Sequence, residues 1–497
     1  MNVKILDCTL RDGGYYTNWD FDKSLVDKYL NFTNKLPISY LEIGYKSNQI
    51  NNYSGEYFYL PLSTIKYIKD RTKKKIALMI NAKDKINTDI LSNLKPYVSL
   101  IRIATSPEEI QSNLKVAIKL KELGFEVAMN VMYISKVGDS PFYDCLDGIE
   151  KILNYLYMVD SYGSIYPDEL KKIIKKIRLK TNVKLGFHGH NNIELAFSNS
   201  LAAIENGVEL IDCTVLGMGR GAGNLKTELL LTHLKSCVGI DVDLNALGGL
   251  TEAFQPLLEK YKWGVNLAYM VSGSYSMPQN LVMQALEIDR YSLTGIVNQL
   301  KSNERATFPR LKSSGKIDKC MVIGGGNSVT KHLSAIKEYL QLNVNDLIIH
   351  SSSKHIKLFE GVTNTQFFAI AGEEILKINS NLKYIDAYVL GPSPRKINLE
   401  INNSNNFFEL EGGNFPGNYT DSPLSISLVT ALELEVGEVN LIGFDGYNEL
   451  KNKKQLYLMQ ENQNVIDAFL VNDDIISLTP TMYRNIKQGS IYNMIDL

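Results

Sequence analysis

The stretch Val183-Lys-Leu-Gly-Phe-His188-Gly-His190-Asn-Asn192 guides the interpretation of the whole chain. Residues 183–188 are typical of a buried strand, in which residues two positions apart face the same side. His188 and His190 are therefore expected side by side. Two imidazoles at a strand end can hold a divalent metal ion when a carboxylate joins them. The alternative is that two polar residues merely cap a strand.

The composition is that of an ordinary globular enzyme. The 497 residues are 44% hydrophobic and 22% charged, with a formal net charge of -1. This charge balance gives no indication of nucleic acid or an anionic membrane as a partner. No signal sequence and no apolar run of about 18 residues is present, so a cytoplasmic protein is expected. The five cysteines are scattered singly and predict neither disulfides nor a cysteine zinc site.

Strands and helices alternate through the first half of the chain. An opening strand at residues 3–10 is followed by candidate strands at 40–44, 75–80, 100–104, 126–132, 157–160, 183–188 and 210–214. Helical patterns lie between them, for example at 20–36, 107–123 and 166–179. Eight strand-helix units over about 240 residues are typical of a (β/α)8 barrel, the TIM barrel. A doubly wound open sheet is the alternative.

Polar residues gather at the carboxyl ends of these strands and favour the closed barrel. In a barrel these ends form one ring that carries the active site, whereas an open sheet is polar only at its switch point. The residues are Arg11, Asp12, Glu42, Arg102, Asn130, Asp160, Ser161, His188, His190 and Thr214. Those that do not bind metal are expected to hold substrate and its waters, or to form a structural polar layer.

Asp12 is the carboxylate expected to join the two histidines. It follows the first strand, and in a closed barrel only strand eight separates strand one from strand seven. Asp12, His188 and His190 then offer two nitrogens and one oxygen to a metal, with positions left for substrate and water. Asp7, inside the first strand, is the competing ligand and is otherwise a core residue. Arg11 is either a fixed cation for a developing negative charge or an ordinary salt-bridge partner of Asp12.

The chain continues past the eighth strand with a glycine-rich loop at 216–228 and a helix at 228–236. Such a loop brings backbone amides to an anionic ligand, unless it is only a flexible turn. Residues 241–310 are predicted to form a helical extension that packs across the barrel or contacts an identical subunit, and a homo-oligomer is expected. Residues 302–318 are polar and are predicted to be a linker. The predicted domains are thus a barrel at 1–240, the extension at 241–310 and a second domain at 318–497.

A smaller Rossmann-like α/β domain is predicted for residues 318–497. A strand at 320–323, the turn Gly324-Gly-Gly326-Asn327-Ser328, a helix at 329–340 and a strand at 346–350 begin a nucleotide-binding fold, although the third glycine of GxGxxG is missing. Later strands are predicted at 384–390 and 438–442, the latter followed by Gly443-Phe-Asp445. The turn and Asp445 form either a phosphate or nucleotide site or only a tight turn of a packing domain.

Three segments resemble the DRE-TIM metallolyases, and within them the 4-hydroxy-2-oxovalerate aldolases. They are Leu6-Asp-Cys-Thr-Leu-Arg11-Asp12-Gly13, His188-Gly-His190-Asn191 and Gly217-Met-Gly-Arg-Gly-Ala-Gly223-Asn224. The resemblance covers roughly the first 300 residues. It implies that Asp12, His188 and His190 bind Mn²⁺, or alternatively Mg²⁺, Co²⁺ or Zn²⁺, and that the oxygens of pyruvate chelate this ion. By the same resemblance Arg11 stabilises the enolate oxygen, Asn224 is an additional ligand or supports one, and Tyr275 orients the substrate.

The chain departs from this family at Tyr15, where characterised aldolases carry a histidine that acts as acid and base on the aldol hydroxyl. A phenol transfers a proton when a neighbouring cation favours its ionised form, or it only stacks against substrate. The predicted function is a divalent-metal-dependent pyruvate aldolase, a carbon–carbon lyase that forms or cleaves a 4-hydroxy-2-oxo acid from pyruvate and an aldehyde. The alternatives are a Claisen-type synthase using acetyl-CoA, of the isopropylmalate or citramalate kind, and a non-catalytic metal-binding scaffold.

The second domain faintly resembles Rossmann-like proteins related to bacterial sialyltransferases and motility-associated factors. The segments that carry this resemblance are Val322-Ile-Gly-Gly-Gly-Asn-Ser328, Leu441-Ile-Gly-Phe-Asp445-Gly-Tyr447 and Leu478-Thr-Pro-Thr-Met-Tyr483. If this domain binds a sugar nucleotide, the chain is expected to serve surface-glycan synthesis.

Overall fold

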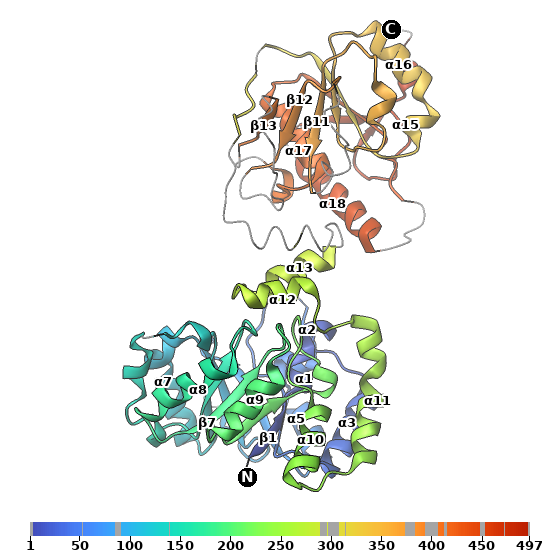
Figure 1. Ribbon diagram of the computed structural model, residues 1–497. Coiled ribbons are helices and arrows are strands. Elements are labelled where there is room, and N and C mark those ends of the chain that lie inside the picture. Colours follow the sequence, from blue (N-terminus) through green and yellow to red (C-terminus); the bar gives the residue numbers. More distant parts are fainter. Residues whose placement is uncertain are drawn as a thin grey trace. The chain divides into compact units, whose positions relative to one another are not determined.

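The chain forms two compact units, Met1–Met283 and Gln284–Leu497, each built on its own parallel sheet (Figure 1). The computed structural model describes residues 3–51, 53–84, 91–138, 140–288, 296, 308–313, 315–372, 383–392, 406–411, 415–447, 453–471 and 473–495. Among the helices in these ranges, none has the length and apolar character needed to cross a bilayer. The domain limits expected at residues 240, 310 and 318 stay predictions.

The first unit is a closed barrel of eight parallel strands in chain order, with β1 paired to both β2 and β8. The barrel is therefore confirmed, and the open sheet is wrong for this half of the chain. Its strands are β1 (Lys4–Asp7), β2 (Tyr40–Tyr45), β3 (Lys75–Asn81), β4 (Leu100–Thr105), β5 (Glu126–Val131), β6 (Tyr155–Asp160), β7 (Lys184–Gly189) and β8 (Leu210–Cys213). Its main helices are α3 (Lys23–Lys35), α5 (Leu62–Lys69), α7 (Ile110–Glu122), α8 (Pro167–Arg178), α9 (Ala196–Glu205) and α10 (Thr227–His233), with the one-turn helix α4 (Glu56–Tyr59) before α5.

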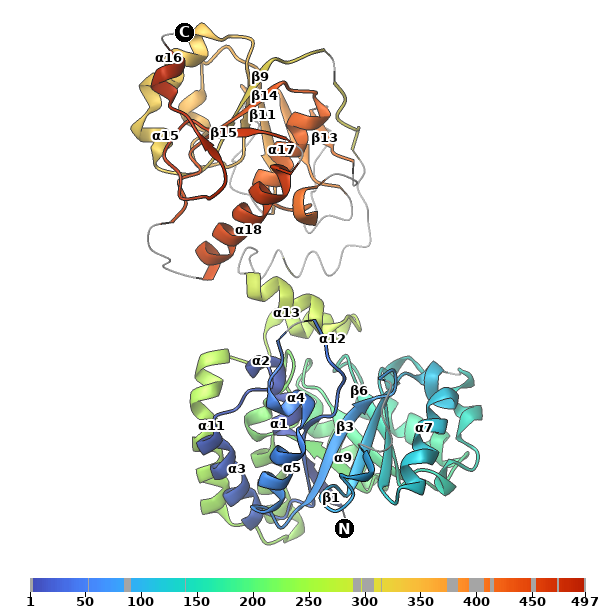
Figure 2. The same cartoon turned by 180° about the vertical axis from the view of Figure 1, so that it is seen from behind.

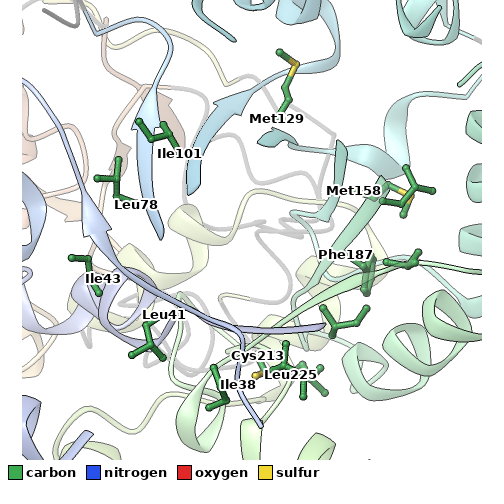
Figure 3. Close-up of a cluster of buried hydrophobic side chains, with 14 of the residues drawn as sticks. Ile38, Leu41, Ile43, Leu78, Ile101, Met129, Met158, Phe187, Cys213 and Leu225 are labelled. Carbon is green, nitrogen blue, oxygen red and sulfur yellow. The ribbon is translucent and has the colours of Figure 1, made fainter. Parts of the chain in front are cut away.

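The outward faces of the strands form the larger core of this unit. Residues such as Leu41 and Ile43 of β2, Met129 of β5 and Phe187 of β7 are fully buried in the cluster that packs strands against helices (Figure 3). Each strand is buried on both sides, as expected where helices surround a parallel barrel.

The inward faces change from apolar to charged along the barrel axis. One layer is made of buried residues that include Leu6, Tyr40, Leu100, Ala128 and Leu210. Because a strand repeats every two residues, the next inward positions on four of these strands are Glu42, Arg102, Asn130 and Asp212. The polar layer thus lies toward the carboxyl ends of the strands, where active sites of such barrels are found.

The first strand is shorter than predicted, and this places Asp12 on a helical turn. Strand β1 ends at Asp7, and the one-turn helices α1 (Thr9–Asp12) and α2 (Gly14–Thr17) follow. The carboxylate of Asp7 accepts the backbone N–H of Thr9 at 3.0 Å and so starts the turn.

Three helices follow α10 in the region of the predicted extension. They are α11 (Leu244–Tyr261), α12 (Leu267–Ser274) and α13 (Gln279–Ile288). Between α10 and α11 the chain makes one π-helical turn, Leu234–Val238. Most of the remaining predicted extension, and part of the predicted linker at 302–318, lie outside the described residues.

The second unit is an open, wholly parallel sheet in the order β13-β12-β11-β10-β9-β14-β15-β16. The strands are β9 (Lys319–Ile323), β10 (Leu347–His350), β11 (Gln366–Ile370), β12 (Ala387–Leu390), β13 (Phe407–Glu409), β14 (Glu438–Ile442), β15 (Ile475–Ser477) and β16 (Lys487–Gln488). Strand β9 is central, with β10 on one side and β14 on the other, so the direction of the crossovers changes there.

Helices cover both faces of this second sheet, so the predicted second α/β domain is confirmed as a parallel sheet between helical layers (Figure 2). Helix α16 (Leu333–Leu342) packs on one face, and α17 (Pro423–Glu433) and α18 (Lys453–Phe469) pack on the other. The helix predicted at 329–340 is in fact two helices, because α15 (Ser328–Lys331) ends before α16 begins.

Candidate metal centre

Asp12, His188 and His190 come together at the mouth of the barrel. One ligand atom from each side chain lies within 4.8 Å of the others. The imidazole centroids are 5.0 Å apart with an interplanar angle of 76°, and Nε2 of His188 is 3.5 Å from Oδ2 of Asp12. All three side chains are buried. The structure therefore brings together the three residues that strand spacing and barrel closure selected.

Both imidazoles are held so that Nε2 is free to bind a cation. Nδ1 of His190 donates to the backbone carbonyl of Asp160 at 2.8 Å, and Nδ1 of His188 is 2.9 Å from Oδ2 of Asp212. A carbonyl oxygen can only accept, so the proton of neutral His190 is on Nδ1 and its Nε2 carries a lone pair. Burial, followed by the charge of His188, lowers the pKa of His190 to about 3. This pattern is typical of metal-binding histidines.

Asp12 is held in its ionised form. Burial alone raises the pKa of this carboxyl, but nearby Arg11 and then the two histidines lower it to about 2. Nη1 of Arg11 lies 2.5 Å from Oδ1, and the side-chain amide of Asn224 donates to Oδ2. The other amide atom, Oδ1 of Asn224, is buried without a hydrogen-bond partner in the described structure. An anionic oxygen, two imidazole lone pairs and an unused amide oxygen are a donor set that fits a divalent cation.

Asp7, the competing ligand, is occupied elsewhere. Besides the Thr9 amide, its carboxylate accepts the hydroxyl groups of Tyr29 at 2.7 Å and Thr227 at 2.8 Å. These partners come from α3 and α10, on the helix side of the strand. Burial raises the pKa of Asp7, in contrast to the lowered pKa of Asp12.

A second group of potential ligands, Cys8, His188 and Asp212, fits a cation less well. Oδ2 of Asp212 already accepts from Arg102 at 2.6 Å and from His188. Burial raises the pKa of the Cys8 thiol well above its ordinary value, whereas metal ions bind the thiolate. The group around Asp12 is therefore the better candidate.

A buried ionic network inside the barrel contacts the candidate ligands. Oε2 of Glu42 accepts from Nε of Arg11 and from Nη1 of Arg102, both at 2.9 Å. Arg102 also donates to Asp212 and, at 3.2 Å, to Oδ1 of Asn130, and its guanidinium stacks over the ring of Tyr157. The network thus runs from Arg11 through Glu42 and Arg102 to Asp212, which orients His188. Glu42, Arg102 and Asn130 have these protein partners in the structure, and a role in holding substrate stays a prediction.

The other predicted substrate residues are placed differently. The carboxylate of Asp160 accepts the backbone N–H groups of Ser164 at 3.0 Å and Ile165 at 3.2 Å, and Ser161 Oγ accepts the N–H of Tyr133 at 2.8 Å. Asp160 thus folds the loop after β6, and Ser161 links that loop to the one after β5. Tyr275 is 57% exposed at the end of α12, and none of its described contacts reaches the ligand group. Its predicted role stays a prediction.

Tyr15 lies among residues that sequence reasoning did not select. Its hydroxyl is 3.2 Å from that of Tyr45, and the guanidinium carbon of Arg220 is 5.1 Å from the centroid of its ring. Tyr45, Arg220 and Asp212 were all missed. A single acid within the apolar run of β8 was a signal for Asp212, and a lone cation among the glycines of the 216–228 loop was a signal for Arg220.

The predicted ligand loop of the second unit is folded around its own partners. The carboxylate of Asp445 accepts the N–H of Ser328 at 2.9 Å, and its hydroxyl as well. The N–H of Gly326 donates to the carbonyl of Gly443, and a Cβ on Gly324 would lie 2.5 Å from the same carbonyl oxygen. Oδ1 of Asn327 accepts from Lys354 at 3.1 Å. The glycines are thus needed for the close approach of two backbones, and ligand binding by this loop stays a prediction.

Comparison with known families identifies the class of the barrel. The model of the family described as HMGL-like matches residues 2–250, half of the chain. The protein belongs to this family, and the predicted membership of the DRE-TIM metallolyases is confirmed for the barrel. The faint resemblance of the second unit to sialyltransferase-related proteins stays a prediction.

Individual relatives agree with this class. A 4-hydroxy-2-oxovalerate aldolase of Pelotomaculum thermopropionicum is 27% identical over 264 residues, which cover 52% of this chain and 78% of the relative. An oxaloacetate decarboxylase of Mycobacterium tuberculosis is 26% identical over 240 residues, 46% of this chain and 69% of the relative. A crystal structure of the N-terminal domain of a Bacteroides vulgatus protein, provisionally named an aldolase, is 47% identical. It covers 59% of this chain and 99% of that domain, with a TM-score of 0.56.

Proposed function

We propose that the barrel is a divalent-metal-dependent pyruvate aldolase that forms or cleaves a 4-hydroxy-2-oxo acid. The observation that carries the proposal is the grouping of Asp12, His188 and His190 within 4.8 Å, with the Nδ1 atoms of both imidazoles engaged by other partners. The aldolase relatives support the reaction type. Mn²⁺ is the ion we infer.

In the synthetic direction, a methyl carbon of pyruvate loses a proton and forms a bond to the carbonyl carbon of an aldehyde, whose oxygen takes up a proton. When bound, the metal supplies a Lewis acid that draws electron density from the ketone of pyruvate. Arg11 supplies the second positive charge at this point. It stays charged because Asp12 and Glu42 raise its pKa, although burial opposes this. Since its Nε and Nη1 are fixed by these two carboxylates, the guanidinium requires no reorganisation as the enolate forms.

Tyr15 is the group we assign to proton transfer at the aldol oxygen. It stands where the family resemblance places a histidine, and its hydroxyl has one described partner, the hydroxyl of Tyr45. The guanidinium of Arg220 lies over the Tyr15 ring, with Cζ 5.1 Å from the centroid, so a cation stands beside the proposed proton-transfer group.

Exchange of pyruvate methyl protons with deuterium oxide tests the proposal. Proton NMR is expected to show loss of the methyl signal that requires Mn²⁺, is abolished in Asp12→Asn and falls at least about 100-fold in Arg11→Ala. Arg71→Ala is the matched control, because Arg71 is exposed and pairs only loosely with Asp27 at 3.5 Å. Absence of metal-dependent exchange in the wild-type protein would contradict the proposal and favour the non-catalytic scaffold.

A second candidate comes from the relative named oxaloacetate decarboxylase. Loss of carbon dioxide from oxaloacetate also leaves a pyruvate enolate, so the same metal and Arg11 serve both reactions. An assay that detects the pyruvate released from oxaloacetate measures this decarboxylase activity.

Release of free thiol from acetyl-CoA tests the Claisen-type alternative. A place in surface-glycan synthesis depends on the second unit, and the absence of a thermal shift with CMP-, UDP- and GDP-sugars would remove its support.

A further inference from the structure

Three arginines surround the candidate metal centre, and one of them has no anionic partner. Arg11 contacts Asp12 and Glu42, and Arg102 contacts Glu42 and Asp212. In the described part of the chain no hydrogen bond or ion pair is formed by the side chain of the third, Arg220. Its Nε is buried without an acceptor. Arg220 is half-buried, and a guanidinium with a buried nitrogen is normally paired, so this side chain is left able to bind an anionic group.

Two hydrogen bonds fix the loop that carries Arg220 to residues near the ends of β1 and β7. The hydroxyl of Tyr16 donates to the carbonyl of Gly221 at 3.1 Å, and the N–H of Asn191 donates to the carbonyl of Gly223 at 2.9 Å. The two glycines have φ angles of +65° and +80°, a conformation that other residues rarely adopt. The backbone at Arg220 is thereby held beside the strand end that carries His190.

The side chain of Arg220 points toward the reaction site and not away from it. Its guanidinium lies over the ring of Tyr15, the residue assigned to proton transfer. Its charge also acts on the ligand group. After burial and His188, Arg220 is among the influences that lower the pKa of His190, and Asp12 is among those that raise the pKa of Arg220 against the effect of burial.

The charges of the site leave room for a second anionic group on the substrate. Asp12, Glu42 and Asp212 carry negative charge, and Arg11 and Arg102 carry positive charge. With a divalent cation the sum is a single positive charge, which the carboxylate of pyruvate balances. The unpaired third arginine adds a further positive charge that nothing in the described protein offsets.

We propose that Arg220 determines specificity by binding a carboxylate or phosphate on the aldehyde-derived part of the substrate. The inference rests on the proposed aldolase function and narrows its substrate class to acceptors that carry an anionic group. Arg220 lies over Tyr15, the residue assigned above to proton transfer at the aldehyde oxygen. This position assigns Arg220 to the aldehyde acceptor and not to the carboxylate of pyruvate. Charge-assisted hydrogen bonds to a guanidinium are of the strength needed for such selection.

Aldol addition to paired acceptors tests this inference. Glyoxylate carries a carboxylate and D-glyceraldehyde 3-phosphate a phosphate, whereas acetaldehyde and D-glyceraldehyde are uncharged. The wild-type protein is expected to prefer one of the charged acceptors, and the preferred one identifies the anion. In Arg220→Gln the ratio of kcat/KM for the charged to the uncharged acceptor is expected to fall about 10–100-fold, with partial recovery in Arg220→Lys.

Lys226→Gln is the matched control, because Lys226 is an exposed cation in the same loop. This variant is expected to keep the wild-type ratio. Equal losses for charged and uncharged acceptors in Arg220→Gln would overturn the inference. A rise in the KM for pyruvate, measured by proton exchange, would overturn it in favour of a role in binding pyruvate.

Failure of the underlying aldolase proposal is recognised separately, because the wild-type protein would then show no metal-dependent exchange of pyruvate protons. In that case calorimetric titration with D-glyceraldehyde 3-phosphate still tests Arg220. The wild-type protein is expected to bind this probe about 10–100-fold more tightly than Arg220→Gln does. Equal affinity for the two proteins would contradict anion binding by Arg220.

Discussion

The barrel and the second unit both place polar residues at the carboxyl ends of parallel strands, but they use them differently. At the barrel mouth Asn224 Oδ1, Glu42 Oε1 and Asp212 Oδ1 are buried without hydrogen-bond partners in the described structure. At the switch point of the second sheet, Asp445 accepts both the amide and the hydroxyl of Ser328. The three barrel atoms are still available to a ligand, whereas the carboxylate of Asp445 already stabilises the protein.

This difference teaches that polarity at a strand end is not sufficient evidence for a site. The informative quantity is the hydrogen-bonding capacity that the fold leaves unused, because buried polar groups are normally satisfied. By this criterion the barrel mouth is the stronger candidate site, and the glycine turn of the second unit is explained by the close approach of Gly324 to Gly443.

Loss of the metal is expected to give the largest contrast between the two regions. Asp12→Asn keeps the shape of the side chain but removes the anionic ligand, so the affinity for Mn²⁺ is expected to fall by more than the roughly 10–100-fold that loss of a supporting residue causes. Calorimetric titration measures it. Asp445→Asn, the matched change in the second unit, is expected to bind one Mn²⁺ like the wild type. Tight binding by Asp12→Asn would remove the contrast.

The next largest effect is expected on the stability of the barrel when its buried ionic network is broken. Arg102→Met leaves Glu42 and Asp212 buried without their shared cation, and the free energy of unfolding of the barrel is expected to fall by about 3–5 kcal/mol. Lys171→Met removes an exposed pair with Asp168 in the same unit and is expected to cost at most about 1 kcal/mol. Chemical denaturation measures both. Similar small losses would show that the network contributes little.

A smaller effect is expected from Asp212, which orients a ligand without touching the ion. Asp212→Asn weakens the hold on Nδ1 of His188 and is expected to lower the affinity for Mn²⁺ about 10–100-fold. Asp168→Asn, on the exposed surface of α8, is the control in a titration with Mn²⁺. If both variants bind Mn²⁺ equally well, His188 does not depend on Asp212 for its orientation.

The smallest effect is expected in the second unit. Ser328→Ala removes a hydrogen bond to Asp445 and is expected to lower the stability of this unit by about 1 kcal/mol. Thermal unfolding of the variant should show this loss, while titration with Mn²⁺ should be unchanged. A large change in metal affinity would show that the two regions are coupled, contrary to the comparison.

Regular periodicity explains what the sequence could predict. Strands repeat every two residues, so the shared face of His188 and His190 followed from their spacing, and barrel closure brought Asp12 to them. The inward positions Glu42, Arg102 and Asn130 followed from the same rule. Their partners did not, because an ionic network joins residues far apart in the chain, as Arg102 and Asp212 are.

Irregular backbone explains most of what could not be predicted. The turn at Thr9–Asp12 depends on a side-chain bond from Asp7, and the place of Arg220 depends on glycines with positive φ. Asp160 was selected as a polar strand end, but its carboxylate bonds the loop amides and its carbonyl orients His190. These turns and hydrogen-bond partners depend on local backbone geometry, which the spacing of hydrophobic residues does not reveal.

Anomalous diffraction from crystals of the whole protein soaked in Mn²⁺ tests the central claim most directly. The account predicts one strong peak at the barrel mouth, bonded to a carboxylate oxygen of Asp12 and to Nε2 of both His188 and His190. A peak held instead by Cys8 and Asp212, or one that lacks either imidazole, would contradict it.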